Sequence, residues 1–473
     1  MNVERKTLMR PYLTAPMIVD FNITCRCNLH CAYCYANANR CLDEEELTLE
    51  EIKTIILELV RLNVLIVRLS GGEPLMRPDF REIFEFCEQQ GLLICINTNG
   101  TLITDEIIQL FKRECVKKVG ISLDSYLEKV HNELRGKTFA YRETVKNIKR
   151  LLGEGLGDKV DVVVTISNLN ANVDEVEQYL EFLGSIGVKN ISFQYAIPVG
   201  RGDDFSDCSP QYDKWKELVI WLYTNKDKYK KIYDIDYVIN LTNESECKFE
   251  LYFPFIEEHR EDLLANVEGA LSLNTNEYIS CEAGNNTIAI TADGKVYPCE
   301  LMMCYKELEA GDLRKNSFEY IWNNSEILRE IRNMKVGELE ENCSICAMKE
   351  ICGGGCRAAA YAYSHNIRAC DKRCPRVAES IEHFVEKITL LNREVIVRKE
   401  FDGYYFSHPI SLKMYHFNNV GYYIFKNLLM NFSKRKIVEL LIVKFNFTTH
   451  MSEEILEEFL VYLYNEGLIE DND

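Results

Sequence analysis

The sequence predicts an α/β protein: a partial (β/α)6 TIM-like barrel, then a small cysteine-rich domain, then a C-terminal α+β domain. Three observations support this fold class. Apolar strand-like runs alternate with amphipathic segments up to residue 200, cysteines crowd residues 281–376, and residues 392–473 pass from strand-like to helix-like runs. With 473 residues, the chain is long enough for two or three such domains.

The barrel is predicted over residues 1–200. Short runs rich in β-branched residues are expected to be strands, and the periodic segments between them, such as 50–62 and 80–91, to be helices. This alternation implies parallel strands joined by right-handed crossovers, and six units suit an open or partial barrel better than a closed one of eight. The strands are expected at residues 17–23, 64–69, 92–97, 119–123, 160–166 and 190–195.

Three further segments follow the barrel. Residues 201–280 are expected to form a connecting segment or lid, with one helix at 215–231 and an irregular remainder. Residues 281–391 form the cysteine-rich domain, which has little apolar core for its length, so metal is expected to hold it together; a trailing helix is expected at 379–391. In residues 392–473 we expect strands at 394–401, 403–409 and 411–418, then helices at 421–432, 434–445 and 452–468.

Composition excludes several classes of protein. The net charge of −19 argues against nucleic acid as a partner, because such proteins carry a basic stripe. We find no apolar run long enough for a membrane span and no signal-peptide pattern, so we expect a cytoplasmic protein with no membrane partner. In a reducing cytosol, 19 cysteines indicate metal or catalytic chemistry rather than disulfides.

The first cysteine cluster directly follows the first expected strand, with the spacing Cys27-x3-Cys31-x2-Cys34. Three thiolates on one tight loop can hold three irons of a 4Fe–4S cluster and leave the fourth iron open to a ligand. Spacing alone also allows a zinc site with Cys25 as a fourth ligand.

Polar motifs follow the next strands, at the ends where barrels assemble active sites. The first is Gly71-Gly72-Glu73-Pro74, in which the glycines allow a close backbone approach and the glutamate can accept from an ammonium group. Residues 97–100 and 122–125 are the polar motifs after the next two strands. His131 is expected to be a local contact at a helix start rather than a base. The acidic run at residues 43–46 is expected to be a solvated loop near which a reductant could dock.

In this order, the motifs resemble those of the radical S-adenosylmethionine superfamily. The resemblance implies that Cys27, Cys31 and Cys34 hold the catalytic cluster, and that the cofactor is cleaved to methionine and a 5′-deoxyadenosyl radical. It also implies a flavodoxin or ferredoxin as electron donor. Ser125 stands where the family usually has glycine. The cofactor-binding positions implied are the aromatic Tyr33, Gly71, Gly72 and Glu73 for the methionyl amine, Ser122 and Asp124 in the next motif, and Arg135 for the carboxylate.

The second cysteine field could be a zinc ribbon on spacing alone, but its whole order resembles the SPASM domain, a module with two auxiliary 4Fe–4S clusters. This raises the expected total to three clusters. For the late ligand of the second cluster, Cys374 is preferred to Cys370 because Asp371 gives it a D-x-x-C ending. The fourth ligand of the first is either Cys304 or an open site for a substrate thiolate. The resemblance assigns Cys281, Cys299 and Cys356 to the first auxiliary cluster, and Cys343, Cys346, Cys352 and the late cysteine to the second.

The C-terminal domain resembles the PqqD-like module, a winged-helix domain that binds the leader of a ribosomally made precursor peptide. The resemblance implies that the leader adds as a strand beside residues Ser411–Phe417 and lies against the last helix. Tethering would raise the concentration of the core peptide at the radical site. A DNA-binding winged helix or a dimerisation domain remain alternatives, although residues 450–473 are acidic and contain no Lys or Arg.

These features predict a radical S-adenosylmethionine/SPASM maturase that forms a thioether or carbon–carbon crosslink in a precursor peptide. A second hypothesis keeps the chemistry but assigns it to a residue of a folded protein, such as a sulfatase, or to cofactor maturation. A third is a non-enzymatic, metal-binding regulator with a winged helix.

Overall fold

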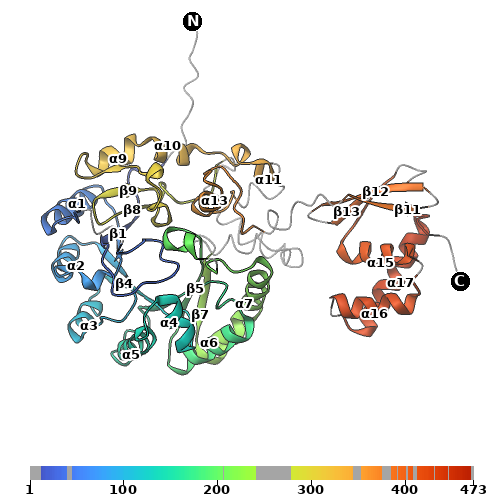
Figure 1. Ribbon diagram of the computed structural model, residues 1–473, viewed down its shortest axis with the longest axis horizontal. Helices are drawn as coiled ribbons and strands as arrows, with labels where there is room; N and C mark the ends of the chain where they lie inside the picture. Colours follow the sequence, from blue (N-terminus) through green and yellow to red (C-terminus); the bar gives the residue numbers. More distant parts are fainter. Residues whose placement is uncertain are drawn as a thin grey trace, which may run out of the picture. The chain divides into compact units, whose positions relative to one another are not determined.

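The structure is a computed structural model, and it divides the chain into two compact units, residues 1–374 and 375–473 (Figure 1). It describes residues 12–39, 45–205, 207–240, 278–344, 353–374, 385–390, 393–400, 403–408, 413–430, 432–445 and 447–469.

The first unit contains a sheet whose parallel strands β1 to β7 lie side by side in chain order (Figure 1). The expected α/β class with a parallel sheet is therefore confirmed. The sheet does not close into a barrel within the described residues. The strands are β1 (Ile18–Thr24), β2 (Ile66–Gly71), β3 (Leu93–Thr98), β4 (Val116–Ser122), β5 (Val160–Ile166), β6 (Asn190–Tyr195) and β7 (Asp236–Asn240).

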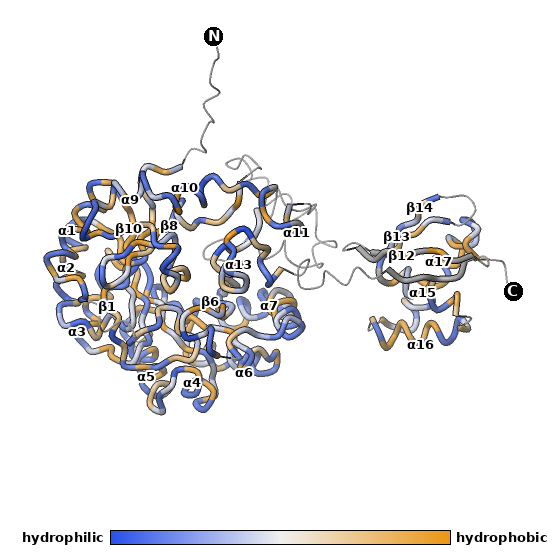
Figure 2. The backbone as a smooth tube through the Cα atoms, turned by 45° about the horizontal axis from the view of Figure 1, so that its top comes forward, coloured by the Kyte–Doolittle hydropathy of each residue, from blue (hydrophilic) through white to orange (hydrophobic). Residues whose placement is uncertain are grey.

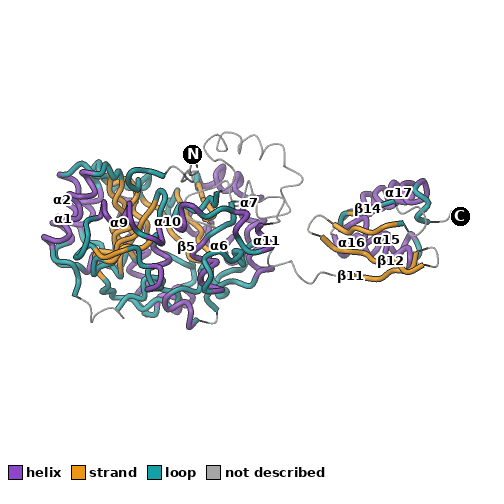
Figure 3. Tube along the Cα trace, turned by 90° about the horizontal axis from the view of Figure 1, so that it is seen from above, coloured by secondary structure: helices purple, strands orange, loops and turns teal. Residues whose placement is uncertain are grey.

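Helices connect these strands, as expected for right-handed crossovers. In α1 (Leu49–Arg61), Thr48 and Glu51 form a capping box at the N-terminus, and the buried Ile52, Ile55, Ile56 and Leu59 share one face. Figure 3 shows the strands of this unit enclosed among its helices. The other helices are α2 (Phe80–Gln89), α3 (Asp105–Phe111), α4 (Glu128–Arg135), α5 (Ala140–Gly153), α6 (Val173–Ser185) and α7 (Tyr212–Tyr233).

Strand β7 corrects the prediction that the segment after the sixth strand is irregular apart from one helix. The helix is present as α7, but β7 follows it and pairs with β6 in the register Asn190↔Asp236. Strand β7 has only five residues between polar flanks, which is too short to stand out from the sequence. Residues 241–277 lie outside the described residues.

The cysteine-rich region extends the same sheet. Strand β8 (Thr287–Ile290) pairs in parallel with β1, and β9 (Lys295–Tyr297) and β10 (Gly311–Asp312) add antiparallel strands beyond it. A second, smaller core packs around Cys356, with Cys281, Cys299 and Cys343 at its margin. Its helices are α9 (Phe318–Asn324), α10 (Glu326–Asn333), α11 (Glu341–Ser344) and α13 (Arg357–Ser364).

The two faces of the parallel sheet differ in chemistry because successive side chains of a strand point to opposite faces. On β1, Val19, Phe21 and Ile23 join the main hydrophobic core, whereas Asp20 and Asn22 point to the other face. Figure 2 shows hydrophobic and hydrophilic residues alternating along the helices of this unit. The core therefore lies between sheet and helices, and the inner face of the sheet is polar.

The second unit has a four-stranded antiparallel sheet in the order β11-β12-β13-β14, followed by three described helices. The strands and helices expected between residues 394 and 468 are present. Its elements are β11 (Val385–Leu390), β12 (Arg393–Glu400), β13 (Gly403–Ser407), β14 (Met414–Phe417), α15 (Asn419–Leu429), α16 (Lys434–Phe445) and α17 (Thr449–Asn465).

Strand β11 shows that the trailing helix expected at residues 379–391 is wrong over residues 385–390. These residues pair with β12, with Val385 opposite Arg398. Val385, Ile388 and Thr389 are β-branched, so a neighbouring strand can override a weak helical period. Residues 379–384 lie outside the described residues. Among the described residues, no helix is long and apolar enough to cross a membrane.

Candidate active site

The loop that carries Cys27, Cys31 and Cys34 begins directly after β1 and is fixed by its own hydrogen bonds. Asn39 closes it: its Oδ1 accepts from the Cys27 N–H at 2.9 Å, and its Nδ2 donates to the Cys27 carbonyl at 2.9 Å. The Asn39 N–H donates to the Cys25 carbonyl at 2.8 Å. The three thiols therefore belong to one ordered loop, which we call the cysteine loop (residues 25–39).

Three glycines from other parts of the barrel pack directly against the cysteine loop. A Cβ atom on any of them would collide with a carbonyl oxygen of this loop, so each glycine allows backbone to lie on backbone. In the Gly71-Gly72 motif, Gly72 thus packs against the cysteine loop, and Gly71 packs against Thr24 at the end of β1. The added Cβ would lie 2.3 Å from the Arg26 oxygen at Gly72, 2.4 Å from the His30 oxygen at Gly136 and 2.4 Å from the Cys34 oxygen at Gly200.

Burial and neighbouring charges shift the pKa of two thiols in the cysteine loop, those of Cys27 and Cys31. Burial raises the pKa of Cys27 to about 12; a hydrogen bond from Leu29 opposes this, and the charges of Glu73, Cys31 and Cys34 add to it. Burial also raises the pKa of Cys31. Thiols so placed need a cation to become thiolates, and an iron–sulfur cluster supplies one. Among the described residues, no three His, Cys, Asp or Glu side chains are grouped so that they could hold a single metal ion. A 4Fe–4S cube does not need such a group, because each of its ligands binds at a separate corner.

Glu73, after β2, is fully buried. Its Oε1 accepts from the Thr98 hydroxyl at 2.7 Å, and its Oε2 accepts from the Asn99 N–H at 2.8 Å. Burial nevertheless raises its pKa to about 7. No described cation pairs with this carboxylate, so an ammonium group of a bound ligand would suit it.

Asp124 and Arg135 form a buried pair beside the cysteine loop. Arg135 Nε and one Nη donate to the two carboxylate oxygens at 2.6 and 2.8 Å, while its other Nη lies 3.7 Å from Cys31 Sγ. The Tyr33 hydroxyl donates to Asp124 at 2.6 Å. Burial raises the pKa of Asp124, but the guanidinium outweighs this and holds it below its usual value. Arg135, expected at the cofactor's carboxylate, is thus already bound to Asp124.

Ser122 and His131 differ in whether their side chains are open to a ligand. Ser122 ends β4 half-exposed, and its hydroxyl has no hydrogen-bond partner among the described residues, so it is open to a ligand. His131 is buried, and its Nδ1 accepts from the Asp124 N–H at 3.1 Å. Burial lowers its pKa to about 4, so the imidazole is neutral. His131 is therefore the local contact that the sequence predicts.

Two residues that hold the cysteine loop were missed from sequence. Glu46 was expected in a solvated loop, but it is half-buried, and its Oε1 accepts from the Thr24 hydroxyl at 2.8 Å and the Cys25 N–H at 2.9 Å. Arg201, after β6, donates from Nε to the Cys31 carbonyl at 2.9 Å. Its position after a strand is its only signal in the sequence.

The first predicted auxiliary set comes together in the structure. Burial raises the pKa of Cys299 well above its usual value, and the nearby Cys356 and Cys281 thiols raise it further. Cys304 is exposed, and its thiol donates to the Tyr35 carbonyl of the cysteine loop at 2.8 Å. Cys304 as a fourth ligand stays a prediction.

In the second auxiliary set, the Cys370 thiol donates to the Glu340 carbonyl at 3.8 Å, and the nearby Cys343 thiol lowers the pKa of Cys370 to about 7. Cys374 lies near enough to act on Cys343 by its charge and packs partly against the main core. Both late cysteines thus lie near Cys343, and the preference for Cys374 over Cys370 stays a prediction. Cys346 and Cys352 lie outside the described residues.

Ion pairs and hydrogen bonds lie along the inner face of the sheet. Asp20 and Arg68 pair across β1 and β2 at 2.5 Å. Asp161 accepts from Lys118 and Ser192, each at 2.8 Å.

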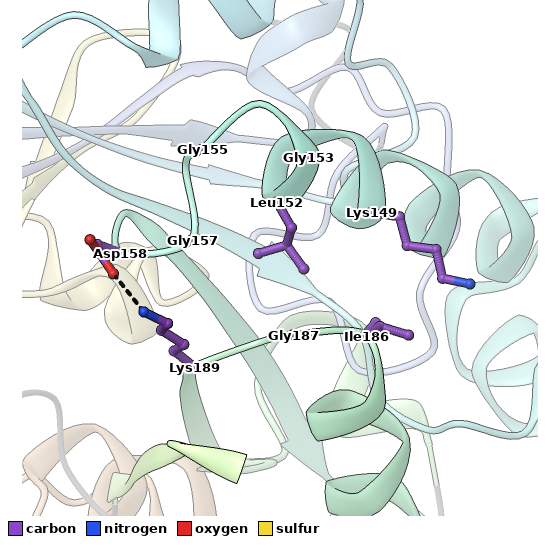
Figure 4. A pocket seen from close by; sticks show the side chains of 9 residues that line it. All are labelled: Lys149, Leu152, Gly153, Gly155, Gly157, Asp158, Ile186, Gly187 and Lys189. Atoms are coloured by element: carbon purple, nitrogen blue, oxygen red, sulfur yellow. Dashed lines mark hydrogen bonds and ion pairs between the residues drawn. The ribbon is translucent and has the colours of Figure 1, made fainter.

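A shallow hollow lies at the opposite ends of the strands, where β5 and β6 begin (Figure 4). Glycines of the two preceding loops form its rim, and Lys189 pairs with Asp158 at 3.4 Å. Both side chains are solvated, and the hollow is remote from the cysteine loop along the strands. It carries no part of the candidate site.

Comparisons with known proteins agree with this geometry. Residues 21–183 match the model of the Radical SAM superfamily, and residues 281–347 match that of an iron-sulfur cluster-binding domain. The chain is 30% identical to the AdoMet-dependent heme synthase of Methanosarcina barkeri, over 74% of this chain and 93% of that protein. It is 29% identical to the mycofactocin maturase MftC of Mycolicibacterium smegmatis, over 76% of this chain and 83% of that one.

Among solved structures, the fold resembles that of Streptococcus suis SuiB bound to its precursor peptide SuiA. The TM-score is 0.58 at 16% identity, covering 77% of this chain and 76% of SuiB. At this identity the likeness concerns the fold alone.

Proposed function

The chain belongs to the radical S-adenosylmethionine superfamily and is an enzyme, and from this premise we propose that it crosslinks a ribosomally made precursor peptide held by its leader. The crosslink is a thioether or a carbon–carbon bond. Because the chain is an enzyme, the hypothesis of a non-enzymatic regulator is set aside. In this proposal, Cys27, Cys31 and Cys34 hold the catalytic cluster, and the cysteines between 281 and 374 hold two auxiliary clusters.

When bound, the cluster and S-adenosylmethionine supply a 5′-deoxyadenosyl radical that abstracts a hydrogen atom from the peptide. The residues of this chain position and shield that chemistry. Glu73 offers its buried carboxylate to the methionyl ammonium, Ser122 offers its open hydroxyl, and Arg135 orients Cys31 through its third nitrogen. The electron donor is proposed to be a flavodoxin or ferredoxin.

The observation that carries the peptide assignment is the edge of strand β14. In the described residues only β13 pairs with it. The His408 N–H donates to the Lys413 carbonyl at 2.8 Å, and partners alternate along an antiparallel ladder. The N–H of the next residue, Met414, therefore points away from β13, and its side chain is 64% exposed. An extended leader can add as a strand at this edge.

Helix α17 lies beside β14 and offers the second wall for a leader. The Tyr415 hydroxyl donates to Glu466 at 2.9 Å, and the rings of Phe417 and Phe459 lie 5.1 Å apart. Val461 and Tyr462 on this helix are exposed. The apolar side chains near an open edge fit alternate side chains of an extended peptide, and the absence of Lys and Arg from α17 disfavours DNA.

Binding of the leader to the full chain tests this proposal. Fluorescence anisotropy measures the binding, with the labelled precursor peptide whose gene lies nearest to the gene of this chain. Met414→Pro removes the outward N–H at the first residue of an edge strand, where the sheet tolerates proline, so we expect binding to weaken about tenfold or more. Met414→Val keeps the N–H and is the matched control. Equal binding by both variants would refute strand addition.

A second candidate is maturation of a tetrapyrrole cofactor, which the similarity to a heme synthase favours. The open edge of β14 favours the peptide over this candidate. Oxidation of a folded protein would need a docking surface rather than an open strand edge. Anaerobic 5′-deoxyadenosine formation with a tetrapyrrole, and none with peptide, would favour the second candidate.

A further inference from the structure

Helix α17 carries a mainly apolar stripe on the side that borders the open edge of β14. Two contacts place this side: the rings of Phe459 and Tyr462 lie 5.1 and 6.2 Å from the ring of Phe417 on β14. From Tyr462 the stripe runs back toward the start of the helix, because residues three or four positions apart are neighbours on a helix surface. Its residues are Tyr462, Glu458, Ile455 and Met451.

This stripe is open to a second chain. Tyr462 and Met451 are 41% and 44% exposed, and Ile455 is half-buried. On β14, Tyr415 and Phe417 are buried toward the helices, because successive side chains of a strand point to opposite faces. A strand added at the β14 edge would follow the same alternation and direct every second side chain toward the stripe. The edge and the stripe together therefore fit an extended peptide.

Glu458 is the charged residue of the stripe. Its side chain is exposed to water in the free protein. A leader that covers the stripe displaces this water, and a covered carboxylate is strongly disfavoured unless a cation pairs with it. Helix α17 itself contains no Lys or Arg that could do so. A Lys or Arg of the leader can supply the cation and lay its aliphatic stem along the apolar part of the stripe.

We propose that Glu458 selects the leader by pairing with one of its Lys or Arg side chains. The inference rests on the proposed function, because it requires a leader at the β14 edge, and it adds the chemistry of that leader. The leader has an extended segment in which a basic residue stands between apolar residues at alternate positions. A leader with Asp or Glu in place of the basic residue is rejected, because two carboxylates would meet.

A double-mutant cycle on leader binding tests the pairing. It uses the full chain and the labelled precursor peptide whose gene lies nearest to the gene of this chain, with each Lys and Arg of the peptide replaced by Gln in turn. Fluorescence anisotropy measures the Kd. One replacement should weaken binding to the wild type about fivefold, but binding to Glu458→Gln by less than about twofold. The wild-type loss should shrink at high salt.

The matched control is Glu453→Gln, because Glu453 is also exposed and lies on the side of α17 turned away from the stripe. It should bind every peptide as the wild type does. Equal losses in the wild type and Glu458→Gln would overturn the inference and leave leader binding intact, as would tight binding of a leader that has no Lys or Arg. No binding of the peptide to the wild type would instead overturn the proposed function, and the inference with it.

Discussion

The cysteine loop and the second auxiliary set place a buried arginine beside cysteine thiols in opposite electrostatic settings. Arg135 shares its charge with Asp124 and reaches Cys31 with one nitrogen, so little net positive charge faces that thiol. Arg357 has only carbonyl acceptors among the described residues, those of Gly354, Ile367 and Ala369. Of these two arginines, only Arg135 has a carboxylate partner among the described residues.

The largest expected effect is a loss of activity that distinguishes the catalytic cluster site from the second auxiliary site. Cys27→Ala should abolish 5′-deoxyadenosine formation, because the catalytic cluster loses one of three ligands. Cys343→Ala should retain that product and lose peptide modification. Chromatography of the nucleoside and mass spectrometry of the peptide measure the two outcomes; loss of 5′-deoxyadenosine in both variants would erase the distinction.

Asp124→Asn removes the carboxylate that pairs with the buried Arg135 beside the cysteine loop. Because Arg135 would be buried without a counter-ion, we expect about 3–5 kcal/mol loss of stability in the cluster-free chain. Urea denaturation measures it. Removing the exposed pair Arg142–Glu128 by Arg142→Gln should change stability by less than about 1 kcal/mol. Similar losses in the two variants would contradict the comparison.

Glu73 is the opposite case, a buried carboxylate with which no described cation pairs. Its pKa rises from 4.5 to about 7 on folding, so the folded chain binds more protons in that window. Stability from this group is complete below pH 4.5 and is lost as the pH rises through 7, by about 1.4 kcal/mol per unit and about 3 kcal/mol in all.

Glu73→Gln should remove this slope. Unfolding of the cluster-free chain at about pH 5 and about pH 8 measures the difference between wild type and variant. The control is Glu106→Gln, because the Glu106 side chain is 79% exposed. A wild-type slope in Glu73→Gln would show that another group is responsible.

Tyr33→Phe should have the smallest effect. It removes one hydrogen bond to Asp124, which keeps both bonds from Arg135, so we expect about 1 kcal/mol loss of stability. Thermal unfolding measures it. A loss as large as that of Asp124→Asn would mean that the hydroxyl, rather than the arginine, holds the carboxylate in place.

The sequence predicts the parallel strands, the cysteine loop and the polar residues after β2 and β4, because local periodicity and spacing encode them. It does not reveal that β8 joins the sheet beside β1, since that pairing links residues far apart in the chain. Strand β11 was predicted as a helix because its partner β12, rather than its own pattern, decides its conformation.

The same limit applies to the site. Glu73 and Ser122 follow from motifs, but the partners of Arg135 and the roles of Glu46 and Arg201 depend on contacts between distant segments.

Mass spectrometry of the precursor peptide after anaerobic reaction with S-adenosylmethionine and dithionite is the decisive test of peptide crosslinking. We expect a loss of two hydrogen masses per crosslink, with 5′-deoxyadenosine formed alongside it, and a much smaller yield with Met414→Pro. An unchanged peptide mass despite 5′-deoxyadenosine formation would contradict it, because the radical would then be directed at another substrate.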